Sequence, residues 1–297
     1  MTAQCRAFVE AEKQAGRNVV KACELLEVSR SAFYASRNRP PCERARQDRE
    51  LTELIATFHA QSRGTYGSPR VHDDLAEAGV HVGRKRVARL MATAGLVGRC
   101  RRRTKKTTIA GDEARAANIV KRVFGPDAWE IDRAWCGDIT YVRTWEGWAY
   151  LATVIDLATR RVVGWAFADH METDLVADAL RMAIAARGPA PGLLFHSDRG
   201  CQYTSGDFRK LLADHDITQS LSRRGQCWDN SVAESWFATY KTELVYRQAW
   251  PTIAKLRTAT FDYIEVFYNR KRRHSALGGL SPMCYEHSRR DRVADAA

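Results

Sequence analysis

The sequence predicts an α/β fold, a five-stranded mixed sheet flanked by helices, preceded by an all-α region of helix-turn-helix type. Two observations predict it. The first third of the chain is basic and shows only helical periodicity, in two short pairs of helices. From Trp135 onward, three consecutive strand patterns with short turns are followed by alternating helices and strands. The three strands predict an antiparallel meander, and the alternation extends it into a mixed sheet covered by helices.

The positive charge of the chain is concentrated in its first third. The 297 residues carry 47 Lys and Arg against 35 Asp and Glu, a formal net charge of +12. Residues 1–106 hold 22 of the basic and 11 of the acidic side chains, a charge of +11, so residues 107–297 sum to +1. A basic module joined to a balanced one indicates a polyanion-binding region, for nucleic acid or for an anionic membrane surface.

Several classes of protein are excluded by composition. No run of about 18 apolar residues exists, so no membrane-spanning helix is predicted. The first ten residues lack the cationic start and apolar run of a signal peptide, so we expect a cytoplasmic protein. The eight cysteines form no Cys-x-x-Cys pair, which disfavours a zinc ribbon or finger and indicates reduced structural thiols.

Residues 1–50 form an N-terminal helical region with a candidate helix-turn-helix. Apolar side chains recur at helical spacing from Val19 to Leu26, and Ser29 can cap a second helix that carries Phe33. Glu27 stands where such a turn usually has Gly, so a plain helical hairpin is an equal alternative.

Residues 51–98 predict a second, clearer helix-turn-helix-like domain that binds DNA. Ser68-Pro69 provides a cap and a proline at the first helical position, and Gly79 ends that helix. The next helix ends at Gly95 and opens with three cations, Arg84, Lys85 and Arg86. Cations at a helix start oppose the helix dipole, which is unfavourable in isolation and suited to docking on phosphates. A solvated charged face is the alternative.

A basic linker is predicted over residues 99–127. It carries Arg101, Arg102 and Arg103 and has little apolar periodicity. We expect these arginines to contact DNA where the linker crosses a DNA backbone; an unstructured tether is the alternative.

Residues 128–250 predict the sheet and its helices, and residues 251–297 a helical basic extension. The strands are expected at 135–144, 148–156, 161–169, 193–196 and 217–221, and the helices at 172–187, 205–214 and 230–246.

Three carboxylates in this part of the chain are the candidate catalytic residues. Asp138 interrupts the first strand, Asp198 follows the fourth strand, and Glu234 falls on the helix expected at 230–246. Taken singly, each acid has another interpretation: Asp138 as a strand-end or edge residue, Asp198 as a turn residue beside Gly200, and Glu234 as a solvated helix residue. Together they could converge on one face of the sheet, where their mutual repulsion would require cations. Hard oxygen ligands select Mg²⁺ or Mn²⁺, and two such ions about 4 Å apart can hold the attacking and leaving oxygens of a phosphoryl transfer. Lys241 lies two helical turns after Glu234, on the same face.

Seven segments of the chain match one family. They are 63–71, 135–141, 154–165, 196–205, 229–237, 241–244 and 268–282, and they include Trp-Cys-Gly-Asp-Ile-Thr-Tyr around Asp138 and His-Ser-Asp-Arg-Gly around Asp198. In these motifs the chain resembles the integrase-type DDE transposases of bacterial insertion sequences, in particular the second-reading-frame product of the IS-three group. The resemblance covers about residues 50–287. It implies an RNase H-like catalytic core like that of retroviral integrases, two divalent metal ions, and cutting and joining of element ends.

The resemblance also implies roles for single residues. Asp138, Asp198 and Glu234 would be the metal ligands, and Lys241 would contact DNA near the scissile phosphate. Asn230 and Gln202 would contact DNA or support the metal ligands. Asp156, on the neighbouring strand, has a structural role in this interpretation. Arg272, in a basic stretch with Asn269 and His274, would contact DNA or the catalytic helix.

The partners implied are DNA, as the terminal inverted repeats of an element and as target DNA, and further copies of the chain. A transposase must bring two ends together, so a homo-oligomer on DNA, at least a dimer, is expected in a bacterial cytoplasm near the nucleoid. Family members are often made as a longer fusion with an upstream reading frame that adds a helix-turn-helix and a leucine zipper. No sustained heptad run occurs here, so the chain either works with that product or is only the catalytic half. The zinc module of retroviral integrases is not expected.

Two alternatives remain open at this point. One is an RNase H-like nuclease that does not join strands. The other is a non-enzymatic DNA-binding repressor derived from a transposase, which would not need three acids. A membrane partner is not expected, because the basic third has no amphipathic helix rich in bulky apolar residues.

Overall fold

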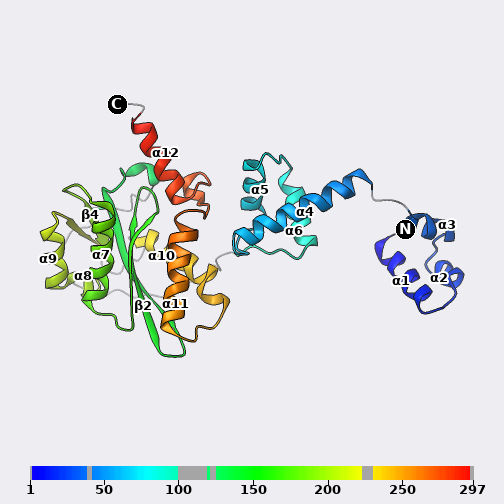
Figure 1. Cartoon of the computed structure of the whole chain (residues 1–297), viewed down its shortest axis with the longest axis horizontal. Helices are drawn as coiled ribbons and strands as arrows, with labels where there is room; N and C mark the ends of the chain where they lie inside the picture. The colour runs from blue at the N-terminus through cyan, green and yellow to red at the C-terminus, as the bar shows by residue number, and fades with distance from the viewer. Residues whose placement is uncertain (1, 39–41, 100–118, 121–124, 223–229, 295–297) are drawn as a thin grey trace. The chain divides into compact units, whose positions relative to one another are not determined.

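A computed structural model describes residues 2–38, 42–99, 119–120, 125–222 and 230–294 (Figure 1). The chain divides into two compact units, Met1–Thr57 and Phe58–Ala297, with the division inside one helix, α4 (Glu43–Gln61). No helix in the described ranges is both long and apolar enough to cross a membrane.

The first unit contains three short helices ahead of α4. They are α1 (Ala3–Gln14), α2 (Val19–Leu25) and α3 (Arg30–Asn38). A small core forms where Val9, Cys23 and Phe33 are buried together. The turn between α2 and α3 places Glu27 in the left-handed region at φ 52°, so the chain makes this turn without a glycine. The Ser29 hydroxyl accepts from the Ala32 amide at 3.1 Å and caps α3, as the sequence predicted.

The second unit begins with a further helical pair, α5 (Ser68–Glu77) and α6 (Arg84–Thr93). Gly79 and Gly95 follow the two helices with φ of 79° and 67°, which confirms them as helix ends. The expected cap at Ser68 is wrong by one residue, because Gly67 is the N-cap and Ser68 is already helical. Apolar side chains on the facing sides of the pair are buried: Val71, Leu75, Val87, Leu90 and Met91.

The sheet is five-stranded and mixed, as predicted. Its strands are β1 (Ala134–Arg143), β2 (Trp148–Asp156), β3 (Val162–Ala168), β4 (Leu194–Ser197) and β5 (Thr218–Leu221). The order is β3-β2-β1-β4-β5, in which β1, β2 and β3 pair antiparallel and β4 and β5 add parallel strands beside β1.

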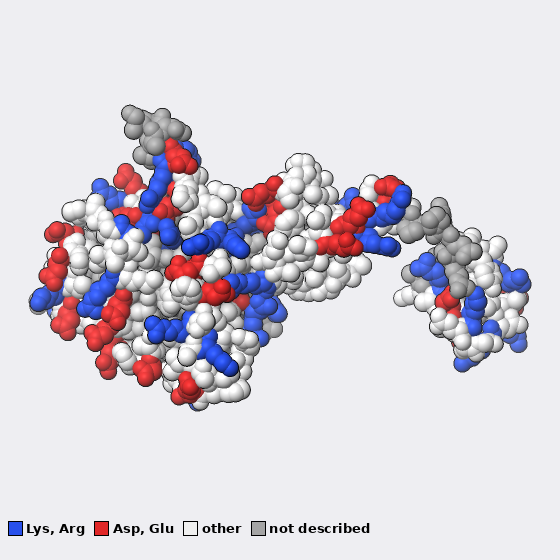
Figure 2. All heavy atoms as spheres, viewed as in Figure 1, with Lys and Arg blue, Asp and Glu red and all other residues white. Residues whose placement is uncertain are grey.

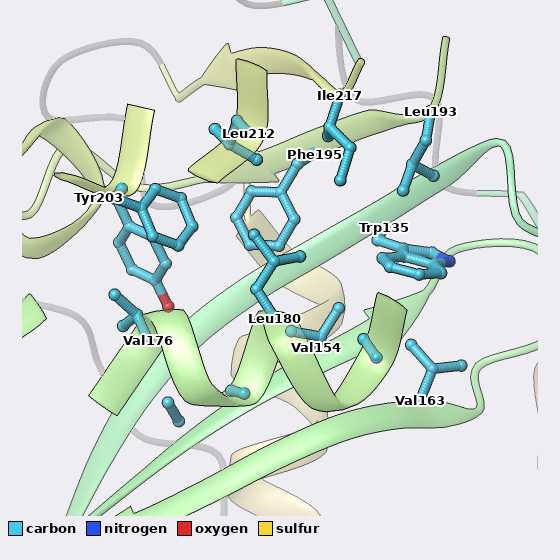
Figure 3. Packing of buried hydrophobic residues seen from close by; sticks show 14 of the residues in the cluster. Trp135, Val154, Val163, Val176, Leu180, Leu193, Phe195, Tyr203, Leu212 and Ile217 are labelled. Atoms are coloured by element: carbon cyan, nitrogen blue, oxygen red, sulfur yellow. The ribbon is translucent and has the colours of Figure 1, made fainter. Parts of the chain in front are cut away.

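Helices cover both faces of the sheet (Figure 1). On one side lie α7 (Thr173–Arg187), α8 (Cys201–Thr204) and α9 (Gly206–Asp214); on the other lie α10 (Ser231–Glu243) and α11 (Ile253–Phe261). The core on the α7 side gathers Trp135, Leu180 and Phe195 from a strand, a helix and another strand (Figure 3). Helix α10 ends before the expected position 246, because Leu244 leaves the helical region at φ −122°.

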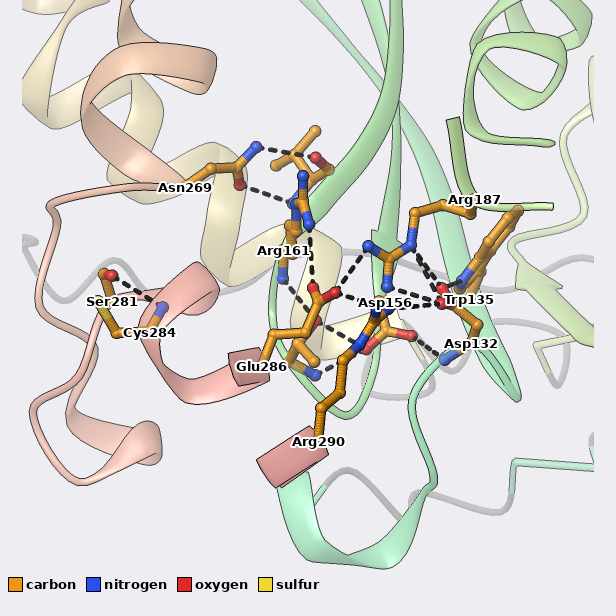
Figure 4. A network of polar contacts seen from close by, with 12 residues as sticks. Asp132, Trp135, Asp156, Arg161, Arg187, Asn269, Ser281, Cys284, Glu286 and Arg290 are labelled. Atoms are coloured by element: carbon orange, nitrogen blue, oxygen red, sulfur yellow. Dashed lines mark hydrogen bonds and ion pairs between the residues drawn. The ribbon is translucent and has the colours of Figure 1, made fainter. Parts of the chain in front are cut away.

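The C-terminal segment packs back onto the sheet. A 3₁₀ turn at Val245–Arg247 joins α10 to the segment that contains α11. After α11 come a π-helix (Asp262–Tyr268), a short 3₁₀ turn (Ser275–Leu277) and α12 (Pro282–Ala294). Glu286 of α12 forms ion pairs with Arg187 at 2.8 Å and with Arg161 at 3.1 Å (Figure 4). Asn269 bonds both backbone groups of Val162, accepting from its amide at 3.0 Å and donating to its carbonyl at 2.9 Å. These polar contacts fasten the tail to the start of β3.

Acidic and basic side chains mingle over the surface of the sheet and its helices, as Figure 2 shows for one face. This mixture agrees with the net charge of +1 that residues 107–297 carry.

Candidate active site

Asp138 lies in the middle of β1, the central strand of the sheet. It pairs with Thr153 of β2, is partly buried, and accepts a hydrogen bond from the Ile139 amide at 2.8 Å. Burial is the main cause that raises the pKa of its carboxyl to about 7, and the negative charges of Asp198 and Glu234 contribute to that rise. The Asp138 carboxyl is therefore held close to two other acids.

Asp198 is brought near Asp138 by the parallel pairing of β4 with β1. That pairing places His196 opposite Cys136, and Asp198 follows directly after β4 ends at Ser197. Asp198 is exposed, and its Oδ1 accepts from the Gly200 amide at 3.0 Å. A Cβ at position 200 would lie 3.1 Å from that oxygen, so glycine leaves room around the carboxylate.

Glu234 comes from the first turn of α10, on the opposite face of the sheet from α7. The start of this helix is tied to β1 by Asn230, whose Nδ2 donates to the Gly137 carbonyl at 3.2 Å, one residue before Asp138. Asn230 is 5% exposed. It therefore holds the helix that carries one acid against the strand that carries another.

Lys241 lies on the same helix and faces the same strand. Its Nζ is 5.3 Å from the centre of the Tyr141 ring. Burial lowers the pKa of the ammonium, and the negative charge of Asp138 acts in the opposite direction. The lysine is thus a cation placed beside the acids.

The donor set of this site is chemically suited to a hard divalent cation. Its carboxylates supply only oxygen. Burial and the neighbouring negative charges, which together raise the pKa of Asp138, both disfavour an ionised carboxylate there, and a bound cation would offset them. No three His, Cys, Asp or Glu side chains within the described ranges are gathered closely enough to hold one ion together. The three acids act on one another through their charges, but they are not close enough together to bind a single ion.

The other expected DNA contacts fall into three groups. Arg84 and Lys85 are exposed and Arg86 is partly buried at the start of α6, whose N-cap, Gly83, has no capping side chain. Arg101, Arg102 and Arg103 lie outside the described residues. Gln202 is 9% exposed and donates from Nε2 to the Met171 carbonyl at 2.9 Å, so it fixes the loop before α7 rather than pointing into solvent.

Arg272 meets one of the two expectations drawn from the sequence. Its guanidinium is buried and bonds Glu243 of α10 twice, from Nε and Nη2 at 2.8 Å each. The geometry argues against a DNA contact and agrees with the other expectation, contact with the catalytic helix. Asp156 is likewise internal, accepting from the Asp132 and Thr159 amides at 2.8 and 2.7 Å, which agrees with a structural role.

Glu243 is the residue of this region that sequence reasoning missed. It is 4% exposed and also accepts from the Tyr263 hydroxyl at 2.9 Å. A signal was present, because Glu243 follows Trp236 and Tyr240 on the apolar face of the helix. An acid on such a face requires a buried cation.

Comparison with known proteins agrees with this architecture. Two family models described as "Integrase core domain" match residues 130–227 and 215–282, and one described as "HTH-like domain" matches residues 46–104. The transposase InsF for insertion sequence IS3A of Escherichia coli (strain K12) is 35% identical over 94% of this chain and 98% of its own length. A 31 kDa protein of insertion element IS600 from Shigella sonnei is 37% identical over 89% of this chain and 96% of its own length. Among solved structures, the HTLV-2 integrase catalytic core domain in complex with magnesium covers 53% of this chain and 97% of its own, with 16% identity and a TM-score of 0.38. The chain therefore belongs to the integrase-core transposases of bacterial insertion sequences, polynucleotidyl transferases of the DDE type.

Proposed function

We propose that Asp138, Asp198 and Glu234 bind two divalent cations, Mg²⁺ or Mn²⁺, and that the chain uses this site to cut and join the ends of an insertion sequence. The observation that carries the proposal is that Asp198, after β4, and Glu234, on α10, lie close enough to Asp138 on β1 for their charges to add to burial in raising its pKa. When bound, such ions activate an attacking oxygen and stabilise the leaving oxygen of a phosphodiester.

The chain's own residues bind and orient the DNA in this proposal. Lys241, steadied against Tyr141, donates to a non-bridging oxygen of the scissile phosphate, where its charge offsets the acids. Asn230 acts by holding α10 on β1, and Gln202 by holding the loop before α7. Both are positioning residues.

The other parts of the chain bind DNA or support the catalytic core. We assign residues 51–98 to recognition of the terminal inverted repeats, with Arg84, Lys85 and Arg86 on phosphates, and residues 99–127 to a basic linker along the DNA. Residues 128–250 form the catalytic core and residues 251–297 brace it. Binding should weaken steeply as salt rises, because counterions are released from each phosphate that is neutralised. At least two copies act on paired ends of nucleoid DNA, alone or with the upstream-frame product.

A strand-transfer assay with labelled terminal-repeat DNA and Mg²⁺ or Mn²⁺ tests the site. We expect joined product from the wild type, and a loss of at least about 100-fold in Asp138→Asn and Glu234→Gln because each removes a charged ligand. Asp214→Asn, an exposed acid on α9, is the matched control and should keep wild-type activity.

The alternatives predict different products. Joined product that survives both substitutions would show that the acids are not the site. Cut ends without any joined product would indicate a nuclease. Binding without cleavage, even with the upstream-frame product present, would indicate a repressor.

A further inference from the structure

A groove of about 530 Å³ lies beside Lys241 and is lined by aromatic and cationic side chains. The β1–β2 hairpin and the segment after α10 contribute them: Tyr141, Arg143, Trp145, Trp148, Lys241 and Tyr246. Trp145 is 76% and Tyr246 74% exposed. Large aromatic side chains that are exposed to solvent in one patch indicate a binding surface.

Two rings of the groove contact each other, and each of them also contacts a cation. Lys241 lies over Tyr141, the Tyr141 and Trp148 rings meet edge to face with centres 5.2 Å apart, and Arg143 lies 5.1 Å over Trp148. Each ring is therefore oriented by a neighbouring charge or ring.

The hairpin tip that carries Trp145 is fixed by the segment after α10. The Trp145 amide donates to the Trp250 carbonyl at 3.0 Å. The Glu146 carboxylate accepts from the Ile253 amide at 2.7 Å and so caps the start of α11. A platform that is already rigid loses little conformational freedom when a ligand binds.

We propose that this aromatic groove binds unstacked bases of the DNA strand next to the phosphate taken by the active site. The inference rests on the proposed function, because Lys241 belongs to both the groove and the catalytic site. Aromatic faces interleaved with Lys and Arg are the composition that binds single-stranded nucleic acid, since every base offers a π-face once it leaves the duplex.

Charge and placement favour DNA over a protein partner. The residues that line the groove include two cations and no acid, which complements a phosphodiester chain. A paired duplex hides the faces of its bases, so the groove would prefer an end that is unpaired or distorted. Melted bases beside the cut site would then be held open while the strand is joined.

The test compares two terminal-repeat DNAs, one fully paired and one with a short unpaired stretch beside the cleaved phosphate, each with 2-aminopurine at that place. We expect the wild type to bind the unpaired DNA more tightly and to change the 2-aminopurine emission. Trp145→Ala should weaken binding of the unpaired DNA by roughly 5- to 100-fold and leave the paired DNA within about 2-fold. Phe261→Ala, which removes a 52% exposed aromatic from α11, is the control and should change neither.

Two binding results would overturn the inference: equal affinity of the wild type and Trp145→Ala for the unpaired DNA, or no change in the 2-aminopurine emission. A change in the oligomeric state of Trp145→Ala without DNA would also overturn it, because it would assign the groove to protein contact. Strand transfer, measured alongside, separates the two proposals. Joined product with no effect of Trp145→Ala on binding overturns only the groove. A clear effect on binding with no joined product from the wild type supports the groove and overturns strand transfer.

Discussion

Replacing Arg272 with Met removes the cation of a buried ion pair that joins α10 to the C-terminal segment. In the wild type, Glu243 receives two hydrogen bonds of 2.8 Å from Arg272 and one of 2.9 Å from Tyr263, and Arg70 lies 3.8 Å away. Both members of the Arg272–Glu243 pair are almost wholly buried. The variant leaves the Glu243 carboxylate in the interior with the hydrogen bond from Tyr263 and the longer ion pair with Arg70.

Removing one partner of a buried pair costs about 3–5 kcal/mol, because the remaining charge stays desolvated. Tyr263 and Arg70 still face Glu243, so we expect the lower end, about 3 kcal/mol of the free energy of unfolding. The double variant Glu243→Leu/Arg272→Met removes both charges and should recover most of that loss, since apolar replacement of a whole pair is often close to neutral.

Urea unfolding followed by tryptophan fluorescence measures the free energy for the wild type, the two single variants and the double variant. DNA affinity is measured on the folded proteins over a series of salt concentrations. A loss of stability below about 1 kcal/mol in Arg272→Met, with weaker DNA binding and a shallower salt dependence, would refute the structural role and restore the DNA contact.

Three further substitutions test other parts of the fold. Gly164→Ala puts a Cβ against the Ala179 carbonyl oxygen where β3 meets α7, and should cost about 1–3 kcal/mol in urea unfolding; an unchanged midpoint would show that the contact is not tight. Asn269→Asp replaces the Nδ2 group, which donates to the Val162 carbonyl, with an oxygen that faces this carbonyl. It should lower the free energy of unfolding by about 1–3 kcal/mol at neutral pH. The loss should exceed that of Asn269→Ala, because repulsion between the two oxygens adds to the lost hydrogen bond. Burial, together with the charges of nearby guanidinium groups, lowers the pKa of His274 to about 3. Its neutral form therefore contributes stability that is complete above the unfolded pKa of about 6.5 and is lost as pH falls toward 3. Between pH 6.5 and 5 the wild type should lose about 2 kcal/mol relative to His274→Asn, and parallel stability curves would contradict this assignment.

The strands and most helices follow from local pattern. β2 has the predicted bounds, and the other strand ends agree within one residue. Strand alternation and glycine ends are properties of neighbouring residues, so they can be recognised without the rest of the fold. The end of α10 was missed because the break at Leu244 has no local signal of that kind.

The candidate site shows the same division. That Asp138 interrupts a strand and that Glu234 lies on a helix could be predicted from local pattern. That Asp198 lies near Asp138 depends on the parallel pairing of β1 with β4, two strands that are separated along the chain by β2, β3 and α7.

The sequence by itself determined the residues on which the proposed chemistry rests: a basic front third, three acids set on a strand, a strand end and a helix, and a lysine two turns beyond the last acid. Only the tertiary structure decided which cations are available for DNA. Arg272 belongs to a basic stretch for which DNA was one expected partner, yet it is paired with Glu243, an acid 29 residues earlier in the chain. Lys241 and Arg143 instead line an exposed aromatic groove. The physical reason is that secondary structure depends on nearby residues, whereas the burial and pairing of a charge depend on partners that only folding brings close.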